Sequence, residues 1–158
     1  MKESVQLLRH TVATLAYRAG KAVRGAPQEF AQFRAAPGVR TPVEILAHMG
    51  DLFDWALSIA RGKEAWKNSA PLEWDAEVAR FFASLNAFDT YLASPDELHA
   101  TVERLFQGPV ADALQHTGQL TILRRAAGVP IRGENYSKAE IAAGRVGPEQ
   151  PPPKREFD

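Results

Sequence analysis

Apolar residues recur at helical spacing through most of this chain, and no segment alternates between apolar and polar residues as a half-buried strand does. Four long segments carry such a stripe, at about residues 3–24, 42–61, 71–93 and 109–127, with a shorter one near 95–107. A stripe of this kind buries one side of a helix against other helices. We therefore expect an all-α fold, an antiparallel four-helix bundle with an extra short helix and an extended C-terminal tail.

Capping signals indicate where two of these helices begin and end. Thr41 is a suitable N-cap, Pro42 fits the first helical position, and Glu44 completes a capping box three residues after Thr41. Further along the chain, Pro109 fits the first position of the last helix, and Gly128 fits its C-terminal cap. These signals predict one helix that starts at Thr41 and another that runs from Pro109 to Gly128.

The region between these two helices has its own boundaries. Residues 63–70 are polar and are predicted to form a loop, with Trp66 as a lid or packing residue. Pro71 opens the third long helix, and Ser94 followed by a proline opens the short helix, which should stop at Gly108.

Beyond Gly128 the chain changes character and is predicted to be extended. A second capping box at Ser137–Glu140 predicts a short helix to about Ala143, before a proline-rich end. We expect residues 1–128 to form the bundle and residues 129–158 to be a C-terminal extension that packs on the bundle or is partly disordered.

Composition narrows the classes of function. Lys plus Arg and Asp plus Glu both number 19 among the 158 residues, and the formal net charge of 0 gives no support to binding of nucleic acid or an anionic membrane surface. The chain has no cysteine, which excludes disulfides, Cys-ligated zinc and a protein thiol nucleophile. No signal peptide or membrane-spanning segment is visible, so we expect a cytoplasmic protein.

Three polar residues are predicted to point toward the apolar side of two helices. Asp112 and His116 lie four residues apart in the last helix and therefore share one face, together with apolar residues. His48 lies within the apolar stripe of the second helix. A buried carboxylate and imidazole need partners, and a divalent metal with open coordination positions is one candidate. A satisfied core histidine is the alternative for His48.

Two motifs carry a resemblance to a known family. Thr41-Pro-Val-Glu-Ile-Leu-Ala-His48-Met and His116-Thr-Gly-Gln119-Leu together resemble segments of the DinB/YfiT-like superfamily of bacterial four-helix-bundle proteins, in the same order along the chain. The resemblance covers about residues 3–128. It implies a divalent metal, zinc or nickel, held by His48, Asp112 and His116. Asp112 stands where the family usually has histidine, although relatives resembling the mycothiol-dependent maleylpyruvate isomerases carry a carboxylate there.

The resemblance implies a metal-dependent enzyme acting on a small-molecule substrate: a hydrolase, or a thiol-dependent transferase or isomerase. Any thiol chemistry would need an exogenous low-molecular-weight thiol, because the chain has none. A homodimer is expected by the same resemblance. The alternative is a non-catalytic, metal-binding or metal-free dimeric protein related to stress. Asp51 and Gln119 lie near the proposed ligands along their helices, but neither is assigned as a general base.

Two interpretations concern residues outside the ligand set. The tail is predicted to be a strap along the bundle; in the alternative it folds over the metal end, with Glu134, Asn135 or Tyr136 as walls of the site. Arg124 and Arg125 are interpreted as solvated charges at the end of the last helix, where cations suit the helix dipole.

Overall fold

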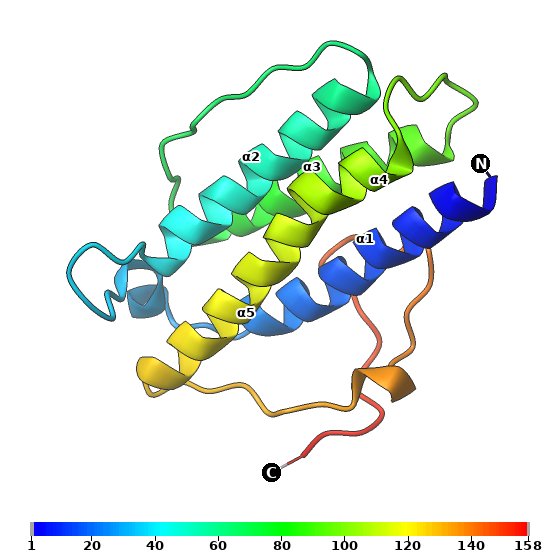
Figure 1. Ribbon diagram of the computed structural model, residues 1–158. Helices are drawn as coiled ribbons and strands as arrows, with labels where there is room; N and C mark the ends of the chain where they lie inside the picture. The colour runs from blue at the N-terminus through cyan, green and yellow to red at the C-terminus, as the bar shows by residue number, and fades with distance from the viewer. Residues whose placement is uncertain (1, 158) are drawn as a thin grey trace.

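Four long helices make up about half of the computed structural model, which describes residues 2–157 (Figure 1). They are α1 (Lys2–Val23), α2 (Pro42–Ala60), α3 (Trp74–Ala93) and α5 (Ala111–Ala126). The shorter elements are α4 (Val102–Leu105), the π-helical segment η2 (Phe106–Val110) and the 3-10 turns η1 (Gln28–Gln32) and η3 (Tyr136–Lys138). Residues 2–157 contain no strand, only an isolated bridge between Glu134 and Glu156. The expectation of an all-α fold is confirmed.

The start of α2 is confirmed at the level of individual hydrogen bonds. The Glu44 backbone N–H donates to Thr41 Oγ1 over 3.4 Å, and the Thr41 backbone N–H donates to Glu44 Oε2 over 2.6 Å. Pro42 is the first residue of the helix, as its missing N–H allows. This cap involves only neighbouring residues, and it fixes the start of α2, the helix that carries His48.

The helix that carries Asp112 is longer than predicted, and its start is different. Thr101 caps it, with Oγ1 accepting from the Arg104 backbone N–H over 3.2 Å, so the predicted start at Ser94 is wrong. The helical backbone then runs through Gly108 and Pro109 as η2 and continues into α5. Pro109 cannot donate a backbone hydrogen bond, and the wider π turn accommodates it. The stop predicted at Gly108 is therefore wrong.

At the other helix ends, one predicted boundary is confirmed and two are wrong. Gly128 has φ 75°, which only glycine adopts readily, and the predicted end of the last helix is confirmed. The third long helix begins at Trp74, not at Pro71, because the segment that contains Pro71 stays extended. The short helix predicted from Ser137 is reduced to the 3-10 turn η3, which Asn135 caps.

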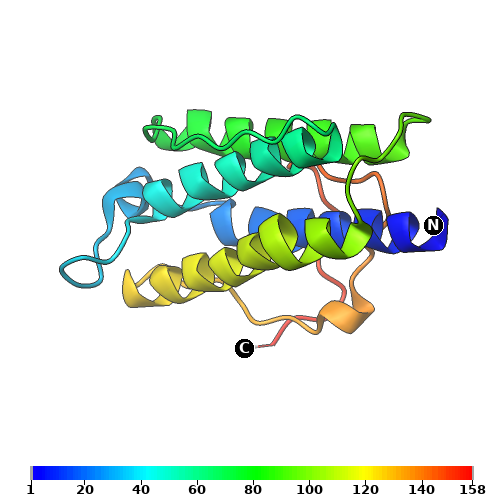
Figure 2. The same cartoon turned by 45° about the horizontal axis from the view of Figure 1, so that its top comes forward.

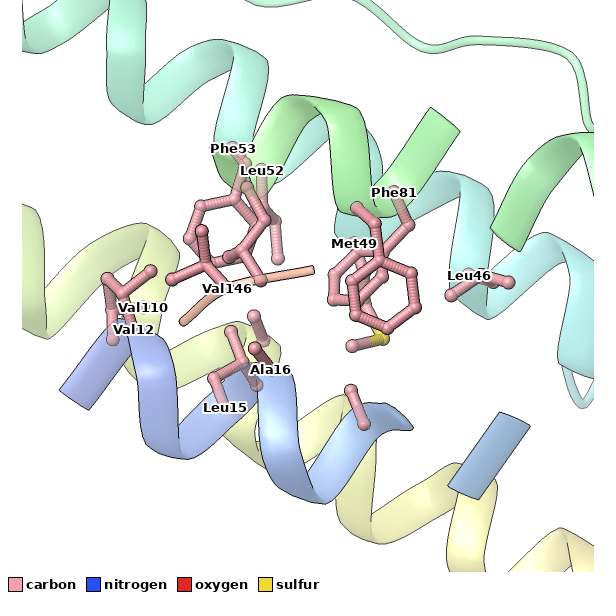
Figure 3. Packing of buried hydrophobic residues seen from close by; sticks show 14 of the residues in the cluster. Val12, Leu15, Ala16, Leu46, Met49, Leu52, Phe53, Phe81, Val110 and Val146 are labelled. Carbon is pink, nitrogen blue, oxygen red and sulfur yellow. The ribbon is translucent and has the colours of Figure 1, made fainter. Parts of the chain in front are cut away.

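The four long helices enclose one apolar core. Each packs against two others: α2 against α3 and α5, and α1 against α5 and α3 (Figures 1 and 2). Figure 3 shows the side chains that meet there, among them Leu15 of α1, Phe53 of α2 and Phe81 of α3. Val146, from the tail, is only 1% exposed and inserts into the same cluster. None of the described helices is both long and apolar enough to cross a bilayer.

The tail is attached to α1 by charged and aromatic contacts. The Glu134 carboxylate accepts from Tyr17 Oη over 2.6 Å and from Lys21 Nζ over 2.7 Å. The Tyr136 ring packs edge-on against Tyr17, and the Arg18 guanidinium lies 4.1 Å above the Tyr136 ring centroid. Glu134 and Tyr136 therefore serve contacts with α1, and the interpretation of them as walls of the metal site is wrong.

Arg124 also differs from its interpretation. It is 5% exposed and donates to the backbone carbonyls of Ala22, Arg24 and Val129. Burial lowers the pKa of its guanidinium. Arg124 is thus a buried link between the ends of α5 and α1, whereas Arg125 is exposed.

Candidate metal centre

The three residues that the sequence singled out lie together between α2 and α5. Asp112 bridges the two imidazoles: its Oδ2 lies 3.3 Å from His48 Nε2, and its Oδ1 lies 3.4 Å from His116 Nε2. The two rings are nearly perpendicular, with centroids 4.8 Å apart. One ligand atom of each residue lies within 4.8 Å of those of the other two. Two rigid helices therefore bring two nitrogens and one oxygen to a common point.

The cluster is partly buried and open on one side. The side chains of His116 and His48 are 11% and 19% exposed, whereas that of Asp112 is 41% exposed. The imidazoles are therefore shielded by the packed helices, and the carboxylate faces solvent. An arrangement of three protein ligands with an accessible side is typical of catalytic metal sites, since structural zinc sites are usually closed by four protein ligands.

Gln119 determines which nitrogen of His116 faces the cluster. Its Oε1 lies 2.6 Å from His116 Nδ1, so Nδ1 carries the proton that this hydrogen bond requires. In neutral His116 the Nε2 atom then has a lone pair, which points at a carboxylate oxygen. Two acceptors in contact need a positive charge between them, supplied by a bound proton or by a metal ion. The donor set therefore fits a divalent metal, with Gln119 as the outer hydrogen-bond partner that metal-binding histidines ordinarily have.

His48 is held in the neutral form that metal binding needs. Burial is the largest cause that lowers the pKa of His48 below its ordinary value. Electrostatic interactions with His116 and Arg40 lower it further, against the hydrogen bond with Asp112. A neutral imidazole offers a lone pair to a metal without first losing a proton.

The segment between α2 and α3 covers His48 with an aromatic wall. The Trp66 ring lies edge-on to His48 with a centroid distance of 5.7 Å, and edge-on to Trp55 at the same distance. Trp66 is 44% exposed, so it contacts the site while one side remains in solvent. Of the two roles predicted for Trp66, the structure shows packing against a proposed ligand.

Asp51 anchors this segment. Its carboxylate accepts from the Ser69 backbone N–H over 2.8 Å and from Ser69 Oγ over 2.7 Å, and it pairs with the Arg80 guanidinium. Asp51 is 3% exposed and fully engaged by these partners. It is therefore a positioning residue of the loop, and the oxygen of Gln119 is engaged by His116. Neither has a geometry that suits a general base.

A cavity of about 320 Å³ lies beside His48. The segment before α2, α2 itself and the segment after it supply its walls: Arg34, Gly38, Val39 and Arg40, then Glu44, His48 and Asp51, then Asn68, Ser69 and Pro71. Sequence reasoning did not single out Arg34 or Arg40, because neither lies in a motif. The one sequence signal is that Arg40 directly precedes the cap residue Thr41. This signal places Arg40 near His48 only when the position of α2 is already known.

Comparisons with protein-family models, with curated protein sequences and with solved structures found no match to this chain.

Proposed function

We propose that this chain is a metal-dependent enzyme that holds a divalent metal ion with His48, Asp112 and His116. One observation carries the proposal: two imidazoles and a carboxylate from two helices place their ligand atoms within 4.8 Å of one another. The orientation of His116 by Gln119 adds to it, since it leaves a free nitrogen toward the cluster. Zinc or nickel suits a mixed nitrogen and oxygen ligand set of this kind.

The chemistry that we propose is hydrolysis, or thiol-dependent transfer or isomerisation, on a small-molecule substrate. A divalent metal would supply a lowered pKa for a bound water or thiol and would polarise the substrate. The thiol would be an exogenous low-molecular-weight compound, because the chain has no cysteine. The chain itself contributes two neutral nitrogen ligands, the negative charge of Asp112 and the aromatic wall of Trp66, which shields His48 from water on one side.

The wider proposal places the chain in the DinB/YfiT-like superfamily, as an antiparallel four-helix bundle. The pairwise packing of α1, α2, α3 and α5 supports this assignment, as do the two motifs that contain His48 and His116. A cytoplasmic homodimer without a nucleic-acid or membrane partner is part of the same proposal. The balanced charge of the sequence supports the absence of a polyanionic partner.

A second function is favoured by one feature of the same cluster. The Asp112 carboxylate lies close enough to both imidazoles for a shared proton to satisfy the three groups without a metal. The cluster would then join α2 to α5 in a non-catalytic, stress-related dimer. Metal content separates the two functions.

The test is the metal content of protein purified without a polyhistidine tag and equilibrated with zinc or nickel. We expect one ion per chain in the wild type by elemental analysis. We expect loss of that ion in His48→Ala, Asp112→Ala and His116→Ala, and its retention in His10→Ala, which removes an exposed histidine of α1. Added metal should raise the thermal midpoint of the wild type and should leave the midpoints of His48→Ala, Asp112→Ala and His116→Ala unchanged. A wild type that binds no metal under these conditions overturns the proposal.

A further inference from the structure

The cavity beside His48 has a charge distribution that the proposed metal site does not explain. Arg34 and Arg40 lie on the segment that precedes α2, and both line the cavity with His48. His48 is thus part of the cavity wall as well as of the cluster with Asp112 and His116, so a molecule in the cavity would lie beside one of the proposed ligands. The charge expected on such a molecule depends on which charged residues of the cavity already have partners.

Most charges in the cavity wall have partners. Asp51 is neutralised by Arg80 and accepts two hydrogen bonds from Ser69. The Glu44 carboxylate accepts from the Thr41 backbone N–H, and Arg34 lies 3.7 Å from it. Arg34 also donates to the Val39 carbonyl, which holds it at the cavity.

Arg40 is different. No side chain within residues 2–157 forms an ion pair or hydrogen bond with its guanidinium. Its charge nevertheless acts on the cavity, because Arg40 lines the same space as His48. Together with Arg34 it also lowers the pKa of Glu44, to which the backbone hydrogen bond of Thr41 contributes most. An unpaired guanidinium beside a concave surface is suited to bind an oxyanion.

Size and charge limit the class of anion. A volume of about 320 Å³ lies at the lower end of the range for small-molecule sites and therefore suits a small ligand. The wall also contains the Glu44 carboxylate, whose side chain is 40% exposed and which would repel a phosphate with its nearly double negative charge. A singly charged carboxylate would meet less repulsion and matches the planar fork of an arginine.

We propose that this cavity binds a small carboxylate-bearing substrate, with its carboxylate paired with Arg40 and supported by Arg34, and with its other end directed toward His48. This inference rests on the proposed metal-dependent function for the role of His48. The pairing with Arg40 is a property of the cavity alone and can be measured without metal. Specificity then comes from the segment before α2, and reactivity from the cluster between α2 and α5.

The test uses butyrate, a singly charged carboxylate, and its neutral analogue butyramide, titrated calorimetrically at low ionic strength into metal-free and zinc-loaded protein. We expect butyrate to bind at least about tenfold more tightly than butyramide, because only the former pairs with Arg40. Arg40→Gln should remove about tenfold of the butyrate affinity in both metal states and should still bind zinc. Arg61→Gln is the matched control, since Arg61 is an exposed arginine at the opposite end of α2.

Several results would overturn the inference. These are equal affinity for butyrate and butyramide, equal butyrate affinity in the wild type and Arg40→Gln, and tighter binding of inorganic phosphate than of butyrate. Butyrate binding that needs zinc and does not depend on Arg40 would show a carboxylate held by the metal alone, which also overturns it. If zinc does not bind, the metal-dependent function fails, while Arg40-dependent butyrate binding to metal-free protein still supports the cavity assignment.

Discussion

His116 Nδ1 and Gln119 Oε1 lie 2.6 Å apart, one turn from each other on α5. This short hydrogen bond fixes the ring of His116 and directs its other nitrogen toward Asp112. Gln119 therefore belongs to the candidate metal centre, although it would contact no metal. Its effect on affinity can be measured separately from that of the ligands.

We expect Gln119→Leu to weaken zinc binding by about 10- to 100-fold, the usual cost of losing an outer-sphere partner of a metal ligand. Gln119→Glu keeps an oxygen acceptor and should retain binding. Competition with a chromophoric chelator measures both affinities. Gln115→Leu, at an exposed position of the same helix, is the control. Zinc affinity that is unchanged in Gln119→Leu would contradict the assigned role.

Trp66 should report the arrival of a metal at His48. Its ring centroid lies 5.7 Å from that of His48, so we expect nickel to quench its fluorescence. Trp66→Phe should remove most of the nickel-dependent quenching. Trp74→Phe should keep it, because Trp74 is buried against Phe30 near the start of α3. Equal quenching in the two variants would place the bound nickel away from His48.

Asp51 gives a prediction about pH. Burial raises the pKa of its carboxyl, but hydrogen bonds from the backbone and side chain of Ser69 and the contact with Arg80 outweigh burial, so the net pKa lies below its ordinary value of 3.8. A carboxyl whose pKa is lower in the folded state stabilises the fold above its unfolded pKa. That stabilisation is lost as pH falls through the folded pKa.

Asp51→Asn should therefore cost about 1–3 kcal/mol of unfolding free energy at pH 7, because Arg80 loses a buried charged partner. The difference between wild type and variant should shrink when the pH falls below about 4. Urea denaturation of both proteins at several pH values measures this. A difference that stays constant down to pH 3 would contradict the argument.

Glu134 is expected to be the main attachment of the tail. Its side chain is fully buried and bonded to both Tyr17 and Lys21. Glu134→Ala should destabilise the protein by about 1–3 kcal/mol, since the Tyr17 hydroxyl is left buried without a partner and Lys21 keeps only Glu156. Chemical denaturation gives the value. Glu140→Ala, which removes the carboxylate of an exposed pair with Lys154, should change stability by less than about 1 kcal/mol.

Local signals predicted the elements whose hydrogen bonds are local. The cap at Thr41 and the end at Gly128 depend on residues a few positions apart, and both are as expected. Ser94 offered a start signal of the same kind as Thr101, and nothing in the sequence ranks the two. The helix passes Pro109 because its neighbours Leu105 and Val110 are fully buried, and this packing outweighs a local stop signal.

The candidate site likewise combines residues that local spacing predicts with residues that it does not predict. The spacing of Asp112 and His116 within one helix was sufficient to pair them, whereas His48 joined them only through an expected bundle and a family resemblance. Pairs such as Lys21 with Glu134, 113 positions apart, leave no periodic trace in the sequence. The same is true of the cavity, whose walls come from three separate segments.

The π turn at Phe106–Val110 keeps the direction of the candidate site independent of one residue of chain length. A π turn holds one extra residue in a wider turn, and in a regular α-helix one residue corresponds to about 100° of rotation. Removal of one residue between Phe106 and Val110 would rewind this segment as a regular helix and leave the parts on either side of it in nearly the same relative orientation. If the same residues instead formed a regular α-helix without a deletion, the part that carries Asp112 and His116 would turn by about this angle relative to the part that starts at Thr101. The π turn thus compensates for an additional residue without displacing the ligand face.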